Sequence, residues 1–428
     1  FSPASTWLPM YTQDPPESIS RVYTTAPSRT LVGGTTGTIE FQFTNPLPAG
    51  RIYIMTHPMG AQSQAVTLAA DLLANYPGVV TPTLSSNVEG VYYTTIAEQD
   101  ENGREIGGHK TYGIKAQFGG ATNDGGPKRK LLMIAGVHSS GEHTSFVCFR
   151  SCLKYILEST DAAAIALRAN WDIYCYFNIT ANGIFGGHRR HNLRNSLDPN
   201  RDYINKALPE IANLTAAAIA DTGGAIDVSF DWHSFASAQE NFISWSQDTP
   251  QARRFVQLGN VIFGSTARDG GIYSTADDTS TGWAKNTLGA KYSAASEIQQ
   301  RGNNSLANYQ SIGQNWAKTL QATDADGQFF TAPPGSVSFS SINAATSVFN
   351  IENTTPVLRS VSFTSVNIST STVTLLKSSS VSFASINYQA SNFRLLEILP
   401  EYSDAGDKIS KYGHNPFWRN SIFFRGRQ

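Results

Sequence analysis

The chain has 428 residues, a length that suits one large domain with attached segments better than a single small domain. It carries 32 Lys and Arg against 33 Asp and Glu, and this balance argues against a nucleic-acid-binding protein, which needs an excess of basic residues. The 40% hydrophobic content is enough to build a core, which argues against a disordered chain. No apolar run approaches the ~18–20 residues that cross a bilayer, so we expect no membrane span.

Only 15% of the residues are charged, and Ser, Thr and Asn are abundant. This composition favours an extracellular, secreted or particle-associated protein. Three cysteines in a chain of this length exclude a disulfide-stapled scaffold. We expect Cys148, Cys152 and Cys175 to be buried thiols.

Residues 1–50 are rich in Pro, Ser and Thr, and 38–43 alternate between polar and apolar side chains. The alternation predicts a half-exposed strand, so this part is expected to be a β-rich N-terminal segment. From residue 51 to 328, short apolar runs alternate with helical patterns. We predict strands at residues 51–55, 131–137, 171–178, 225–231 and 291–298, and helices at residues 62–76, 143–157, 162–169, 204–220, 251–267 and 305–322.

The predicted fold class of residues 51–328 is α/β, a mixed twisted sheet with helices on both faces. The run Leu131-Leu132-Met133-Ile134 is apolar at consecutive positions, which indicates a strand buried on both of its faces.

Residues 329–428 contain a short internal repeat. The sequence Ser-Val-Ser-Phe begins at residues 336, 360 and 380, and each copy is followed by Ile-Asn or Val-Asn. The alternation of Ser and Thr with Val, Phe and Ile favours strands. We therefore expect a separate Ser/Thr-rich β module, suited to attachment and to assembly with a partner.

The chemistry-bearing residues lie at the ends of predicted strands. His138 and Glu142 follow the strand at 131–137, and His233 ends the strand that contains Asp231. Ligands gather at strand ends in α/β sheets, and two His with one carboxylate can hold zinc with an open fourth position. Histidines near strand ends are, however, more often hydrogen-bonded structural residues, so this pattern alone is weak.

Further motifs follow in a fixed order. They are Asp198-Pro199-Asn200-Arg201, Asp231-Trp232-His233-Ser234, Ile272-Tyr273, and Lys291-Tyr292-Ser293 with Glu297. Together with His138 and Glu142, this order resembles the zinc metallocarboxypeptidases, the carboxypeptidase A-like family. The resemblance extends from residue 51 to about residue 323 and implies that family's α/β fold, a bound Zn²⁺, and hydrolysis of a C-terminal peptide bond.

The resemblance also implies roles for single residues. His138, Glu142 and His233 match the zinc ligands, and Asp198 matches the acceptor that orients the first ligating His. Glu297 matches the carboxylate that activates water as general base, and Arg190 matches the cation that stabilises the oxyanion. The residues that match the group gripping a free C-terminal carboxylate are Asn200, Arg201 and Tyr273. A planar guanidinium can bind a carboxylate through two hydrogen bonds or stabilise an oxyanion, and a desolvated carboxylate can act as a general base.

The sequence departs from the family in three places. The family's first motif is His-x-x-Glu, whereas this chain has one more residue between His138 and Glu142, so His143 is an alternative ligand. Arg189 and Arg194 lie in the same loop as Arg190 and compete with it for the oxyanion role. The position nearest the floor of the side-chain pocket is Thr281, which favours neither basic nor large aromatic C-terminal residues.

Three functions are consistent with these patterns. The first is a zinc carboxypeptidase acting on peptides with a free C-terminal carboxylate. The second is a zinc amidase or deacylase acting on cell-wall or acylated peptides, which would share the ligands. The third is a structural or adhesive protein, possibly of a virus particle, with a vestigial peptidase domain.

Overall fold

The computed structural model divides into two compact units, Phe1–Phe330 and Thr331–Gln428. In the first unit it describes residues 10–14, 24–25, 28–32, 38–42, 49–55, 62–99, 103–123, 125–139, 142, 144–186, 197–235, 243–264, 272–273, 276–299 and 305–329. In the second it describes residues 336–339, 342–344, 349–352, 360–363, 366–368, 373–376, 380–383, 386–388 and 393–396.

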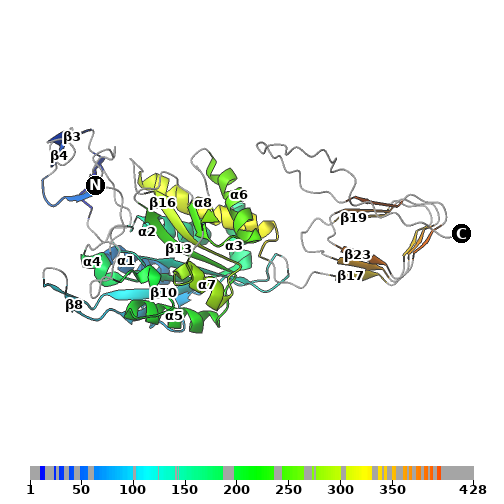
Figure 1. Cartoon of the computed structure of the whole chain (residues 1–428), viewed down its shortest axis with the longest axis horizontal. Helices are drawn as coiled ribbons and strands as arrows, with labels where there is room; N and C mark the ends of the chain where they lie inside the picture. Colours follow the sequence, from blue (N-terminus) through cyan, green and yellow to red (C-terminus); the bar gives the residue numbers. More distant parts are fainter. Residues whose placement is uncertain are drawn as a thin grey trace. The chain divides into compact units, whose positions relative to one another are not determined.

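A mixed nine-stranded sheet forms the centre of the first unit (Figure 1). Its strands, in spatial order, are β15 (Ile272–Tyr273), β14 (Ile243–Ser246), β16 (Tyr292–Gln299), β13 (Val228–Phe235), β11 (Arg129–Ala135), β12 (Trp171–Phe177), β10 (Lys110–Ala116) and β6 (Val80–Pro82), with β7 (Val91–Thr94) also beside β10. The four central strands β16, β13, β11 and β12 are parallel, whereas β10 and β14 run antiparallel to their central neighbours. The expected α/β architecture with a mixed sheet is confirmed.

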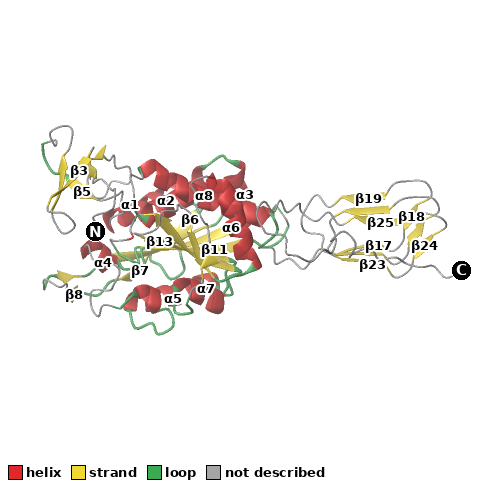
Figure 2. Cartoon of the chain, turned by 45° about the horizontal axis from the view of Figure 1, so that its top comes forward, coloured by secondary structure: helices red, strands yellow, loops and turns green. Residues whose placement is uncertain are grey.

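Helices cover both faces of this sheet (Figure 2). One face carries α1 (Gln62–Asn75), α2 (Ser145–Glu158), α3 (Ala162–Asn170), α6 (Pro250–Phe263) and α8 (Leu306–Ala325). The other face carries α5 (Pro209–Thr222) and α7 (Ser280–Leu288). The short helices α4 (Ala181–Gly186) and η3 (Pro199–Arg201) follow β12 and precede α5. No described helix is both long and apolar enough to cross a membrane.

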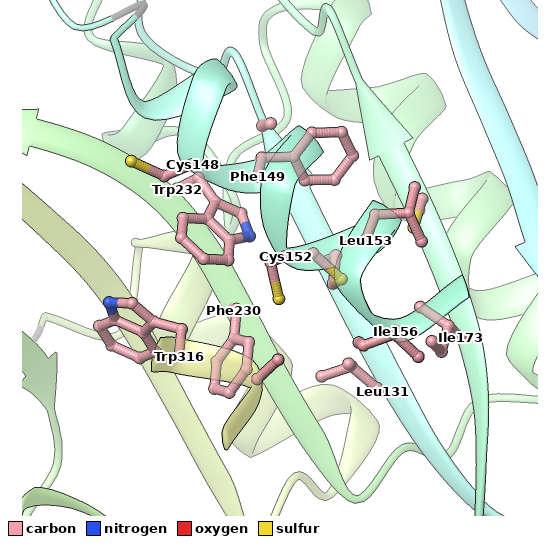
Figure 3. Packing of buried hydrophobic residues seen from close by; sticks show 14 of the residues in the cluster. Leu131, Cys148, Phe149, Cys152, Leu153, Ile156, Ile173, Phe230, Trp232 and Trp316 are labelled. Atoms are coloured by element: carbon pink, nitrogen blue, oxygen red, sulfur yellow. The ribbon is translucent and has the colours of Figure 1, made fainter. Parts of the chain in front are cut away.

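The larger core lies between the sheet and α2, α6 and α8. Phe230 and Trp232 point from β13 to this side and pack against Trp316 of α8, with ring centroids 5.1 and 5.8 Å apart (Figure 3). Cys148 and Cys152 are free thiols buried in the same core, as is Cys175. On β11, Leu131 and Met133 face this core while Leu132 and Ile134 face the other one. The prediction of a strand buried on both faces is therefore confirmed.

Several boundaries differ from the sequence expectation. The strand at 53–55 is β5 (Tyr53–Met55), which pairs with β1 (Met10–Thr12), itself beside β2 (Thr24–Thr25), and does not join the main sheet. The helix expected at 204–220 begins at Pro209, because proline fits the first helical position, which needs no N–H donor. The helix expected at 251–267 ends at Phe263, because Gly264 takes a φ of +62° that ends the helix.

Two hairpins complete the described part of the first unit. They are formed by β3 (Ser28–Val32) with β4 (Thr38–Gln42), and by β8 (Glu98–Gln99) with β9 (Glu105–Ile106).

In the second unit each copy of the repeat supplies one strand to each of three parallel sheets. The first sheet joins β17 (Ser336–Phe339), β20 (Ser360–Phe363) and β23 (Ser380–Phe383); the second joins β18 (Ile342–Ala344), β21 (Val366–Ile368) and β24 (Ile386–Tyr388); the third joins β19 (Phe349–Glu352), β22 (Val373–Leu376) and β25 (Phe393–Leu396). Identical residues pair in register, as Asn343 does with Asn367 and Asn367 with Asn387. This is the arrangement of a parallel β-solenoid, in which each repeat stacks on the one before.

Candidate metal centre

The centre lies where the parallel strands β11 and β13 end. His138 follows β11 after a turn at Gly136, which has a φ of +79°. A Cβ at Gly136 would lie 3.1 Å from Ile184 Cδ1 and 3.3 Å from Asn178 Cα, so glycine suits this position both in conformation and in space. His233 lies within β13, where its alternation with the core residue Trp232 directs it to the opposite face of the sheet.

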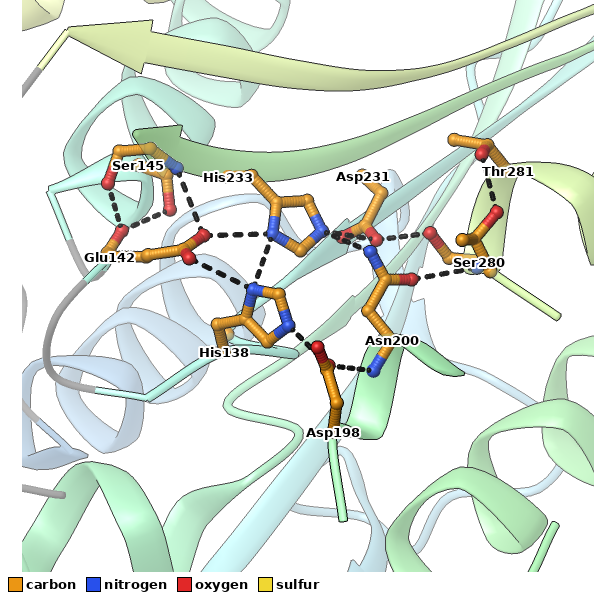
Figure 4. Close-up of polar contacts among 12 residues, drawn as sticks. His138, Glu142, Ser145, Asp198, Asn200, Asp231, His233, Ser280 and Thr281 are labelled. Atoms are coloured by element: carbon orange, nitrogen blue, oxygen red, sulfur yellow. Dashed lines mark hydrogen bonds and ion pairs between the residues drawn. The ribbon is translucent and has the colours of Figure 1, made fainter. Parts of the chain in front are cut away.

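Glu142 is brought to the histidines from the segment before α2. Its backbone carbonyl accepts hydrogen bonds from Ser145 Oγ at 2.8 Å and from Ser234 Oγ at 2.7 Å. Its carboxylate lies against both imidazole rings, with Oε1 3.1 Å from His138 Nδ1 and Oε2 3.0 Å from His233 Nδ1 (Figure 4). Glu142 therefore still reaches His138, although one more residue separates the two than in a His-x-x-Glu motif.

The two Nδ1 atoms are themselves only 3.1 Å apart. The three side chains thus form a triangle, in which the two Nδ1 atoms are 3.1 Å apart and each lies 3.0–3.1 Å from a different oxygen of the Glu142 carboxylate. Ligands of a tetrahedral zinc ion, at about 2.0–2.1 Å from the metal, lie roughly 3.3 Å from one another. These three side chains are the group in the described part of the chain whose spacing suits a metal ion.

The other nitrogen of each ring is held by a carboxylate. His138 Nε2 lies 2.8 Å from Asp198 Oδ1, and His233 Nε2 lies 2.7 Å from Asp231 Oδ2. A carboxylate only accepts, so each Nε2 carries the proton, and each neutral ring then presents the lone pair of its Nδ1. Two lone pairs and a carboxylate facing one another repel unless a cation lies between them. The donor set therefore fits a metal ion.

The charges of the cluster lead to the same conclusion. Among the described residues, the ion pairs of Glu142 and Asp231 are made by the two histidines. Asp231 is fully buried, and its Oδ1 has no hydrogen-bond partner in the described part of the chain. Buried carboxylates require nearby positive charge, which neutral imidazoles do not supply.

The same contacts shift the pKa values of the cluster. Burial lowers the pKa of His138, but Glu142 and Asp198 outweigh that effect and raise it above its ordinary value. Burial likewise opposes the rise in the pKa of His233, yet Asp231 and Glu142 raise it well above the usual range. Burial raises the pKa of Glu142, but His138 and His233 hold it well below its usual range. In the metal-free protein, protons on the two imidazole rings would therefore supply the positive charge that a metal ion would otherwise supply.

Glu297 lies next to the metal group on the neighbouring strand. It pairs in register with His233, and in-register neighbours on parallel strands point to the same face of a sheet. Its side chain is half-buried. The structure therefore places Glu297 on the strand beside His233 and on the same face of the sheet.

The segment from Asp198 to Arg201 forms η3 next to the cluster. Asp198 accepts the backbone N–H of Asn200 at 2.9 Å while it also holds His138. Asn200 is buried, and its Nδ2 lies 3.4 Å from His233 Nε2. Arg201 is exposed and donates from its guanidinium to the Asn200 carbonyl at 2.6 Å. The short helix η3 and its N-cap residue Asp198 thus position all three predicted residues.

Other predicted residues lie outside the described part of the chain. Arg190, with its alternatives Arg189 and Arg194, belongs to residues 187–196, which lie outside the described part of the chain, and so does His143. Tyr273 is placed by its backbone alone, in β15 opposite Trp245. The roles suggested for these residues stay predictions.

Two members of the cluster had no role in the sequence analysis. Asp231 contacts His233 from the same strand, and Ser280, at the start of α7, donates to Asp231. The spacing Asp-x-His within a strand was the available signal, because residues two apart share a face. Ser280 had no comparable signal, since its contact depends on how α7 packs. Thr281 is buried, and its hydroxyl lies 2.9 Å from that of Thr279.

Comparisons with known proteins define the fold. No protein-family model matches the chain, and no curated protein matches it in sequence. Among solved structures, a metallo-carboxypeptidase from Burkholderia cenocepacia matches at 16% identity with a TM-score of 0.55, covering 74% of this chain and 80% of that one. A metallo-carboxypeptidase from Pseudomonas aeruginosa, in complex with (2-guanidinoethylmercapto)succinic acid, matches at 16% identity with a TM-score of 0.51 over 74% of this chain and 80% of that one. The chain therefore has the carboxypeptidase A-like fold of the metallo-carboxypeptidases.

Proposed function

We propose that the protein is a zinc-dependent carboxypeptidase. The observation that carries the proposal is the triangle of His138, Glu142 and His233, with the second nitrogen of each ring held by a carboxylate. Two neutral imidazoles and one carboxylate form a ligand set of catalytic zinc sites, which leave a further position open. The triangle lies at the strand ends of a carboxypeptidase A-like fold.

When bound, zinc polarises the peptide carbonyl and lets a water molecule ionise near neutral pH. Glu297, one strand away from His233, would act as the general base that takes a proton from the attacking water and passes it to the leaving amine. Arg190 is assigned to the developing oxyanion from the sequence alone.

The hydrogen bonds of Asn200 support its role in holding a substrate carboxylate. Its Oδ1 accepts the backbone N–H of Ser280 at 2.9 Å, which identifies the other end of the amide as the NH₂ group. That NH₂ group contacts His233 Nε2, which already donates to Asp231 and so cannot accept. With respect to the described residues, the amide protons are therefore available to an anion. Arg201, the next residue, is exposed, and the guanidinium N–H groups that do not donate to the Asn200 carbonyl can contact a carboxylate.

A pair of peptides tests the proposal against its alternatives. Purified protein should contain one zinc per chain and release the last residue of a peptide with a free C-terminus, but not of the same peptide amidated. Equal cleavage of both peptides would favour the amidase or deacylase. Absence of bound zinc after dialysis against zinc would leave the structural or adhesive protein.

The β-solenoid is proposed as the attachment module, because its stacked repeats place corresponding residues in register along three sheets. An extracellular or particle-associated location stays a prediction from the composition.

A further inference from the structure

Asp231 lies between the metal ligand His233 and Ser280, the residue that also holds the substrate-anchoring Asn200. Its Oδ2 accepts from His233 Nε2 at 2.7 Å and also from Ser280 Oγ (Figure 4). Both Asp231 and Ser280 are fully buried, so water does not compete for these contacts. The carboxylate that orients a metal ligand is thus itself held by a hydroxyl from α7.

Ser280 uses a second atom to hold the substrate side of the site. Its backbone N–H donates to Asn200 Oδ1, while its hydroxyl donates to Asp231. The position of Ser280 is fixed because Thr279 caps α7 by accepting the N–H of Gly282. One residue therefore fixes both the carboxylate behind His233 and the orientation of the Asn200 amide.

We infer that Asp231 and Ser280 are positioning residues that couple the metal centre to the substrate-carboxylate anchor. Asp231 keeps the proton of His233 on Nε2, so that Nδ1 faces the metal. Ser280 holds Asp231 in place through its hydroxyl. By donating its backbone N–H to Asn200 Oδ1, it also directs the Asn200 NH₂ group away from Ser280, so that a substrate carboxylate can accept from that NH₂ group. The inference rests on the proposed function, and it adds two residues to which the sequence comparison assigned no role.

Zinc affinity in full-length variants tests this arrangement, measured by competition with a chelator. Asp231→Asn should weaken zinc binding about 10- to 100-fold, the usual cost of losing such an outer partner. Ser280→Ala, which removes the hydroxyl and keeps the backbone N–H, should weaken it about 3- to 10-fold. Because both act through one contact, the double variant should bind zinc no more weakly than Asp231→Asn alone. Ser229→Ala, a buried serine of β13 outside the cluster, should bind zinc as the wild type does.

The visible spectrum of the cobalt-substituted protein supplies an independent measurement. Ser280→Ala should shift the d–d bands, although Ser280 does not contact the ligand atoms, whereas Ser229→Ala should leave them unchanged. Unchanged zinc affinity and spectrum in Ser280→Ala, or additive losses in the double variant, would overturn the coupling. A wild-type protein that binds zinc but cleaves no peptide would contradict the proposed function and leave this inference standing, while one that binds no zinc would overturn both.

Discussion

His233 and Glu297 occupy paired positions on the adjacent parallel strands β13 and β16. The pairing places a predicted metal ligand and a predicted general base side by side, on the face of the sheet opposite to the Trp232 and Trp316 core. Since both residues lie on strands rather than loops, the backbone ladder holds their spacing.

This pairing predicts how Glu297→Gln will behave. Glutamine has the same shape but cannot take a proton, so zinc content should be unchanged while kcat falls about 10²- to 10⁴-fold. Zinc analysis and peptide hydrolysis on the same preparation check this. Glu89→Gln removes an exposed carboxylate that pairs with Lys110 and should retain full activity. Full activity in Glu297→Gln would remove this residue from the mechanism.

Removal of a ligand should abolish the site. His233→Ala leaves Asp231 buried without its histidine, and Glu142 loses one of its two histidine partners. The variant should no longer bind stoichiometric zinc, and zinc should no longer raise its midpoint of thermal unfolding. In the wild type, zinc at 100 times its Kd should raise the free energy of unfolding by about 2.7 kcal/mol. Calorimetry with and without zinc measures both effects. A variant that still binds zinc tightly would point to a different ligand set.

The pKa shifts predict opposite pH trends for the metal-free and zinc-loaded proteins. The raised pKa values of His138 and His233 contribute stability that is present below the ordinary histidine pKa and is lost as the pH rises through the folded values. The metal-free protein should therefore lose stability as the pH rises above the ordinary histidine pKa of 6.5. Zinc competes with the same protons, so its affinity and the stability that it adds should increase with pH. Parallel trends in the two forms would contradict this cluster as the zinc site.

The packing of α2 on α8 gives a prediction about stability. A Cβ on Gly313 would lie 2.1 Å from the Cys148 carbonyl oxygen, so Gly313→Ala must separate the two helices. We expect a loss of about 1–3 kcal/mol in the free energy of unfolding, as for other overpacked cores. Urea denaturation measures it, with Gly119→Ala as the control, because a Cβ there meets no atom within 4 Å. Equal stability of the two variants would show that the helices can move apart without cost.

Truncation tests the separation of the two units. A chain ending at residue 330 retains every described member of the metal centre. Zinc content and peptidase activity per molecule should therefore equal those of the full chain, while any self-assembly seen by light scattering should be lost. Loss of zinc binding on truncation would show that the second unit supports the site.

Much of the site could be predicted because its residue types are chemically specific and most of them follow strands or lie within them. The run 131–134 indicated a buried strand, and His138, His233 and Glu297 follow from where β11, β13 and β16 lie in the chain. Strands β10 and β14, which flank the four parallel strands, were not predicted, because their partly polar sequences carry no clear period. Strand β5 was predicted, but its partner β1 was not, since pairing between distant segments leaves no local pattern.

The α/β class, the repeat and the set of residues able to bind a metal could be inferred from the amino-acid sequence, because alternation, burial patterns and ligand chemistry are local properties. The contact of Glu142 with both histidines despite the longer spacing could be seen only in the folded chain, as could the contacts by which Asp231 and Ser280 join His233 to Asn200. Those contacts link β13, η3 and α7, and their geometry depends on how the helices pack against the sheet.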